Sequence, residues 1–91
     1  MAVCLIFEAP GGTEAQYEQV RSEVAPGDVP PPGATYHAAG PTEDGTWCVV
    51  EVWESREALE SFAAEILPPA LERAGLSGQV RIFEVSRIMQ L

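Results

Sequence analysis

The stretch VVEVWES, residues 49–55, decides the fold because it ends the strongest strand signal in the chain. It belongs to TWCVVEVW (46–53), whose β-branched and aromatic side chains are typical of a β-strand. Both alternating sets of side chains in this segment are predominantly apolar, and Glu51 is the one charged residue among them. A strand of this kind needs apolar cover on both faces of its sheet, so a single layer of helices is not enough for it.

Signals on either side of this strand predict the element order β-α-β-β-α-β. The other expected elements are strands at 3–7, 34–40 and 79–85 and helices that begin after Thr13 and after Ser55. Both residues suit helix N-caps, and Gln16 completes a capping box with Thr13. Pro68 and Pro69 are expected to interrupt the second helix, with a short helical turn resuming over 70–75.

This order is the ferredoxin-like α+β arrangement, in which one domain (1–91) carries a four-stranded antiparallel sheet with both helices on one face. The other face would then be apolar and uncovered, which marks a partner site. The sequence therefore predicts a homodimer whose two sheets pack face to face and close an α+β barrel. Glu51 and Trp53 belong to the same alternating set, and both are expected to point toward that barrel.

Composition narrows the classes of partner. The net charge is −9, from 14 acidic residues against five arginines, so nucleic acid and membrane surfaces are not expected to bind.

The start of the chain, MAVCLIFEAP, lacks the basic region of a signal peptide, which favours a cytoplasmic protein. Cys4, Cys48 and a single histidine cannot supply four zinc ligands, so no metal is expected. The two cysteines suit small buried thiols, with a cross-strand disulfide as the alternative.

Two segments resemble a known family. PPGATYHAAG (31–40) and VEVWESREALESF (50–62), in this element order, resemble the antibiotic-biosynthesis-monooxygenase-type domains of the dimeric α+β barrel superfamily. The resemblance implies a homodimer with a ligand cavity in each protomer, between the sheet and the helices. It also implies activities such as cofactor-free oxygenation of aromatic polyketides, haem degradation, cyclisation or decarboxylation.

The haem-degrading branch of that family can be compared residue by residue. Its active-site tryptophan is matched by Trp53. The branch also uses an asparagine on the first strand and a histidine in the helix that follows the tryptophan. This chain contains no asparagine, and it offers Leu5 on the strand and Phe62 in the helix. Haem degradation is therefore not expected.

His37 is the only histidine, and its ordinary pKa suits proton transfer near neutrality. If the 34–40 and 46–53 strands pair odd with odd positions, His37, Val49 and Glu51 share a face. Neighbouring strands lie about 4.8 Å apart, so the imidazole and the carboxylate could touch or share a water. The pair could serve catalysis, ligand orientation or structure. An ion pair of Glu51 with Arg81 is a further alternative.

The remaining candidates concern binding. Trp53 offers either a flat wall for an aromatic ligand or an ordinary core residue, whereas Tyr17 and Tyr36 are expected to pack. The loop PGDVPPPG (26–33) is either a stiff connector or a lid over the cavity. The residues expected to bind substrate together with Trp53 are Leu5, Phe7, Val49 and Phe62.

For function, these residues favour a small cofactor-independent enzyme acting on an apolar aromatic or polyketide-like molecule. Its reaction would be oxygenation or proton-transfer chemistry such as cyclisation, isomerisation or decarboxylation, with His37 and Glu51 as catalytic residues. The alternative is a non-catalytic dimeric domain that binds a small ligand or serves as an interaction module.

Overall fold

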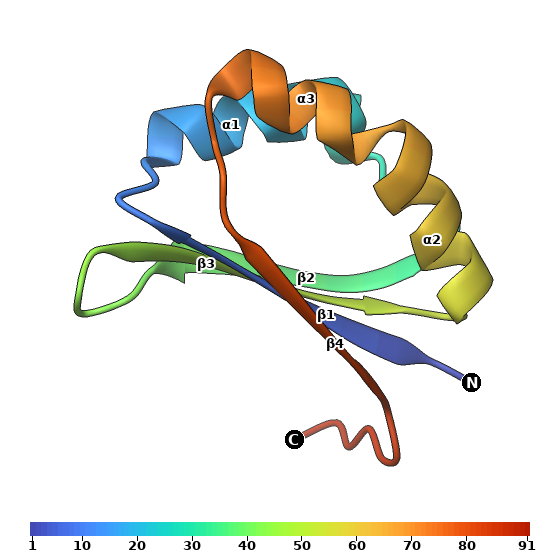
Figure 1. Ribbon diagram of the computed structural model, residues 1–91. Helices are drawn as coiled ribbons and strands as arrows, with labels where there is room; N and C mark the ends of the chain where they lie inside the picture. The colour runs from blue at the N-terminus through green and yellow to red at the C-terminus, as the bar shows by residue number, and fades with distance from the viewer.

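A four-stranded sheet with helices on one face makes up the computed structural model, which describes residues 1–91 (Figure 1). Its elements, in chain order, are β1 (Val3–Pro10), α1 (Glu14–Val24), a 3-10 turn η1 (Pro26–Asp28), β2 (Ala34–Pro41), β3 (Thr46–Trp53), α2 (Arg56–Glu65), α3 (Leu67–Ala74) and β4 (Gln79–Glu84). The strands are ordered β2-β3-β1-β4, and every neighbouring pair is antiparallel. This is the predicted ferredoxin-like α+β fold.

The predicted helix starts are confirmed at both caps. Gln16 N donates to Thr13 Oγ1 at 3.1 Å, and Thr13 N donates to Gln16 Oε1 at 3.0 Å, which completes the capping box. Ser55 Oγ accepts from Ala58 N at 3.1 Å at the start of α2. These contacts satisfy backbone donors that the first turn of a helix leaves free.

Two boundaries differ from the sequence-based prediction by more than one residue. Pro68 and Pro69 do not interrupt the helical layer for long, because they lie in the first turn of α3, where a missing N–H costs nothing. The third helix is therefore a full element rather than a short turn over 70–75. Strand β1 extends beyond Phe7 to Pro10, since Ala9 and Pro10 still pair with β3.

The helices decide which side of the sheet is buried. In Figure 1, α1, α2 and α3 arch over one side of the sheet, here termed the helix side. The largest buried apolar residues of β1 and β3 point to this side, and the helices add core residues of their own. The strand members of this core are Val3, Leu5, Phe7, Ala9, Trp47, Val49 and Trp53. Leu59 and Phe62 of α2 pack onto them.

The opposite side of the sheet, here termed the open face, has no helix on it (Figure 1). The strand registers assign to it, among others, Cys4, Ile6, Glu8, Tyr36, Ala38, Gly40, Cys48, Val50, Val52, Gln79, Arg81 and Phe83. Tyr36, Val50 and Phe83 are exposed there. Cys4 and Cys48 are both free thiols on this face, and burial raises the pKa of the Cys4 thiol.

The direction of Glu51 was predicted wrongly. Glu51 and Trp53 lie on the helix side, together with Val49, and not on the face that would form a dimer barrel. Alternation along β3 shows which residues share a side but not which side the helices cover. That choice depends on the hand of the βαβ crossover, which is a property of the whole chain.

Candidate functional site

A cavity of about 330 Å³ lies between the helix side of the sheet and the helical layer. Residues from β1, β2, β3, all three helices and the loop after α1 line it, and most of them are apolar. Leu5, Phe7, Val49 and Phe62, which the sequence suggests as ligand contacts, all line this cavity. Their side chains come from three different elements, so the cavity exists only once the helices pack on the sheet.

Trp53 is placed differently from its predicted role as a ligand wall. It is fully buried, it is not among the lining residues, and its ring packs against Phe62 with centroids 5.0 Å apart. Of these two aromatic residues, Phe62 lines the cavity and Trp53 lies behind it. Trp53 contributes to the site through its N–H group instead.

His37 and Glu51 meet at the wall of this cavity. The register pairs them directly across β2 and β3, as the odd-with-odd hairpin predicts. His37 Nδ1 lies 3.0 Å from Glu51 Oε2. The Glu51 side chain is only 15% exposed, whereas that of His37 is 43% exposed. The carboxylate is thus the inner member of the pair and the imidazole is the member closer to solvent.

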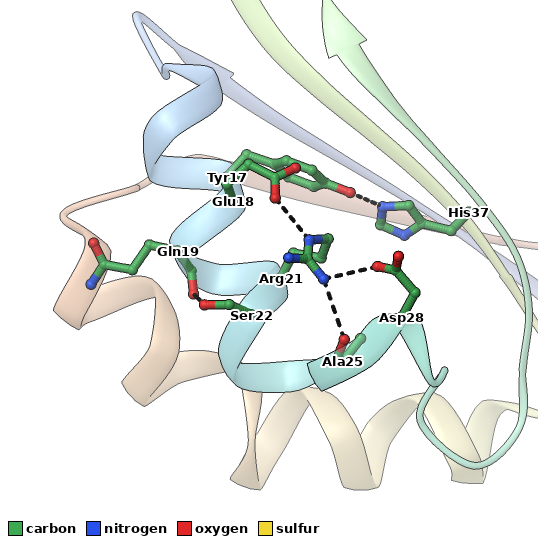
Figure 2. Close-up of polar contacts among 8 residues, drawn as sticks. All are labelled: Tyr17, Glu18, Gln19, Arg21, Ser22, Ala25, Asp28 and His37. Carbon is green, nitrogen blue, oxygen red and sulfur yellow. Dashed lines mark hydrogen bonds and ion pairs between the residues drawn. The ribbon is translucent and has the colours of Figure 1, made fainter.

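Tyr17, which the sequence predicts to be a packing residue, extends the pair to a third residue. Its hydroxyl lies 2.6 Å from His37 Nε2, and Figure 2 shows the two side chains reaching toward each other from α1 and β2. The pKa of the Tyr17 phenol is raised, first by burial and then by the negative charge of Glu18. The phenol therefore stays protonated near neutrality and can donate to the imidazole.

The three groups form one chain of hydrogen bonds. An ionised carboxylate only accepts, so Nδ1 of His37 carries the hydrogen that Glu51 Oε2 receives. In the neutral ring Nε2 is then the acceptor, which matches the hydroxyl donor of Tyr17. A proton accepted at Nε2 would give an imidazolium held between Tyr17 and the Glu51 carboxylate.

The second oxygen of Glu51 also has a partner. Trp53 Nε1–H donates to Glu51 Oε1 at 3.1 Å. Arg81, suggested by the sequence as an alternative partner, instead pairs with Glu8 at 2.9 Å on the open face. The registers explain this difference, because Arg81 pairs with Ile6 and thus points away from the helix side.

Two charged residues, Arg21 and Asp28, also line the cavity. Arg21 of α1 donates through Nε to Glu18 at 2.9 Å and through Nη1 to Asp28 at 2.8 Å (Figure 2). Its hydrogen bond with Glu18 raises the pKa of the Arg21 guanidinium. Arg21 Nη1 also donates to the carbonyl of Ala25 at 3.4 Å. These contacts tie the loop after α1 to the helix.

The loop of residues 26–33 forms one wall of the cavity through Asp28, Pro30 and Pro31. Its far end lies against α2, because a Cβ on Gly33 would meet the Cβ of Ala58 at 2.6 Å. Gly33 has φ +91°, a conformation that favours glycine. The loop is therefore anchored at both ends.

Two further features concern ligands and membranes. The structure contains no group of three or more histidine, cysteine or carboxylate side chains that could hold a metal ion. None of its helices combines the length and the apolar character needed to cross a membrane.

Comparisons with known proteins identify solved structures of similar fold. No protein-family model matches the sequence, and no curated protein matches it either. Among solved structures, SnoaB, a cofactor-independent oxygenase from Streptomyces nogalater, matches with a TM-score of 0.67 and 20% identity over 97% of this chain and 95% of that one. Rv0793 from Mycobacterium tuberculosis matches with a TM-score of 0.75 and 14% identity over 99% and 100% of the two chains.

A third solved structure, of an antibiotic biosynthesis monooxygenase, matches with a TM-score of 0.66 and 16% identity over 93% of this chain and 99% of that one. The structural neighbours of this chain therefore include monooxygenases of the antibiotic-biosynthesis type, as the sequence resemblance implies. At these identities the likeness establishes a shared fold.

Proposed function

We propose that this protein is a small enzyme that needs neither metal nor organic cofactor and removes a proton from a hydroxylated aromatic molecule in the cavity. The observation that carries this proposal is the hydrogen-bond chain Tyr17–His37–Glu51 along the wall of an apolar cavity. A volume of about 330 Å³ lies within the range of small-molecule sites, which runs from roughly 300 to 1,000 Å³. Apolar walls with a few convergent polar groups are typical of such sites.

Proton transfer follows from the order of the three groups. A ligand hydroxyl that donates to the Tyr17 oxygen allows the Tyr17 proton to pass to Nε2 of His37. The ligand proton then replaces the one that Tyr17 lost, and the ligand is left as an anion. The negative charge of Glu51 stabilises the imidazolium that results, as a carboxylate behind a histidine does in other proton-transfer sites. The reverse transfer makes the same chain an acid.

Two kinds of reaction begin with this step. In an oxygenation, the ligand anion itself reduces O₂, so that a ring CH₂ and one O₂ become a ring C=O and one H₂O. In a cyclisation, isomerisation or decarboxylation, the proton returns to a different atom of the ligand. The likeness to SnoaB, described as a cofactor-independent oxygenase, supports testing oxygenation first.

The homodimer belongs to the same proposal. The open face presents exposed apolar side chains, with Tyr36, Val50 and Phe83 among them. Monomeric proteins rarely leave contiguous apolar surface of this kind on a sheet. Two copies packed through their open faces would cover it and would leave the cavity on the helix side of each protomer accessible.

The test is a turnover assay with dihydroxyanthrones and related hydroxylated tricyclic aromatics, under air and under argon. Oxygen uptake and the ultraviolet–visible spectrum of the product would be followed together. His37→Gln and Glu51→Gln are expected to lower kcat by about 10² to 10⁴-fold, the usual contribution of a general acid–base group. Glu8→Gln is the matched control, because it changes the same kind of carboxylate on the open face.

The outcomes separate the two candidate functions. Turnover that falls in both cavity variants and not in the Glu8 control supports the enzyme. Saturable quenching of tryptophan fluorescence by the same compounds, without turnover in air or argon, would support the non-catalytic ligand-binding alternative. An absence of both binding and turnover across the panel would overturn the proposal.

A further inference from the structure

We infer that Trp53 is a positioning residue: its indole N–H holds the Glu51 carboxylate, and the carboxylate in turn sets the tautomer and orientation of the His37 ring. The catalytic consequence rests on the proposed function, but the structural claim stands on its own geometry. In this role the Trp53 indole packs in the core and also holds Glu51 by a hydrogen bond, without touching the ligand.

The two side chains meet because of their spacing on β3. Residues two apart on a strand point to the same side of the sheet, so Trp53 and Glu51 are neighbours on the helix side. The indole N–H donates to Oε1 at 3.1 Å, and Oε2 is left for His37 Nδ1 at 3.0 Å. Each oxygen of the carboxylate thus has its own partner, and rotation of the carboxylate would break both contacts.

Burial gives this contact chain a direction. Trp53 is fully buried and packs on Phe62, so its ring has no room to change rotamer. Glu51 is largely buried, whereas the His37 side chain is the most exposed of the three. Core packing therefore fixes the indole of Trp53, the indole N–H fixes the Glu51 carboxylate, and the carboxylate fixes the His37 ring. A hydrogen bond at one ring nitrogen is what selects the tautomer of a histidine.

The chain contains a matched control for this inference. Trp47 is also on β3, on the same side of the sheet, and buried in the same core. Its Nε1–H is buried without a hydrogen-bond partner, whereas that of Trp53 donates to Glu51. Replacing either tryptophan by phenylalanine removes a comparable apolar volume, but only one replacement removes a donor from the site.

The experiment uses the fact that His37 is the only histidine. Long-range ¹H–¹⁵N correlation spectra of the purified protein report the tautomer of that ring directly, above the pH at which the ring becomes neutral. The wild-type ring is expected in the Nδ1–H form. Trp53→Phe is expected to move the population toward the Nε2–H form, which is the commoner one for free histidine. Trp47→Phe is expected to leave the tautomer unchanged, because a phenylalanine ring can keep the packing of Trp47 on Tyr17, whose ring centroid lies 5.3 Å away, and no hydrogen bond of the site is lost.

A replacement that keeps the packing covers the case in which Trp53→Phe fails to fold. In the Trp47→Phe background, benzothienylalanine incorporated in place of tryptophan has the shape of the indole without its N–H. It is expected to produce the same change of tautomer as Trp53→Phe. A wild-type tautomer in the folded Trp53 variants, or an equal change in Trp47→Phe, would overturn the inference.

Kinetics give the second readout once a substrate is known. Because Trp53 does not line the cavity, Trp53→Phe is expected to lower kcat about tenfold, as loss of one hydrogen bond to a charged group does. KM is expected to stay within about twofold, because uniform binding is unaffected. A change confined to KM would contradict a positioning role. The tautomer experiment decides the structural claim even if no substrate turns over, so the two proposals can fail separately.

Discussion

The helix side and the open face of the sheet each carry a partly covered carboxylate, and the two carboxylates have different partners. Glu51, on the helix side, binds the imidazole of His37 and the indole of Trp53. Glu8, on the neighbouring strand, points to the open face and pairs with the guanidinium of Arg81 at 2.9 Å. The Arg81 side chain is 70% exposed, so this contact is an ordinary surface ion pair of small energetic value.

The helical layer accounts for this contrast between the two carboxylates. An arginine keeps its charge throughout the ordinary pH range, so the Glu8–Arg81 pair cannot exchange protons with a ligand. An imidazole can exchange protons near neutrality, and that of His37 lies at the wall of an apolar cavity on the helix side. The cover by α1, α2 and α3 therefore distinguishes the side that carries the cavity and the His37–Glu51 pair from the side that exposes apolar residues.

The largest expected effect compares truncations on the two sides. Leu59→Ala removes a fully buried side chain between α2 and the sheet, and it is expected to lower the free energy of unfolding by about 3 kcal/mol. Val50→Ala, on the open face, is expected to lower the free energy of unfolding by less. The size of this decrease should depend on protein concentration if that face joins two copies. Urea unfolding at several protein concentrations measures both.

The expectation fails if the loss of unfolding free energy depends on protein concentration for Leu59→Ala and is constant for Val50→Ala. The sides would then differ in packing but not in the way that the proposed dimer requires.

The next effect concerns self-association through the open face. Phe83→Asp places a charge where an exposed aromatic ring now lies, and it is expected to weaken self-association by about 100-fold or more. Sedimentation velocity over a range of concentrations gives the dissociation constant. Ile66→Asp, an apolar-to-acid change at a similarly exposed position in the helical layer, is the control and should leave association unchanged. A wild-type protein that is monomeric at every concentration would contradict the proposed dimer.

The smallest effect concerns the two tyrosines, since Tyr17 packs against the core beneath the helical layer and the exposed Tyr36 side chain lies on the open face. In a Tyr36→Phe variant the remaining phenol is expected to ionise above its ordinary pKa of about 10, because burial disfavours the phenolate. The ultraviolet absorbance of the phenolate, titrated in folded and in denatured protein, gives both midpoints.

The sign for stability follows from the same pKa shift. Below the unfolded pKa both states of Tyr17 are protonated, so its contribution is complete there. As pH rises from that value through the higher folded pKa, the unfolded state loses its proton first and stability falls. Tyr17→Phe should remove this part of the alkaline slope. Equal midpoints in folded and denatured protein would place Tyr17 in water and remove it from the proposed proton path.

Local patterns in the sequence account for much of this molecule. The element order, the N-caps Thr13 and Ser55, and the strand at 46–53 all follow from turn chemistry, capping residues and alternation. The direct pairing of His37 with Glu51 also follows, because a short hairpin sets the register between its own two strands. These features depend on residues that are close together along the chain.

Long-range packing determines which side of the sheet carries the candidate site. Alternation along β3 is the same whichever side the helices cover, so the sequence pattern could not show that Glu51 faces the helices. Tyr17 reaches His37 from a helix 20 positions away, and Arg81 finds Glu8 across the β1–β4 pairing. The burial of Trp53 depends in the same way on α2. Contacts of this kind come from the hand of the crossover and from long-range packing, which no single stretch of sequence contains.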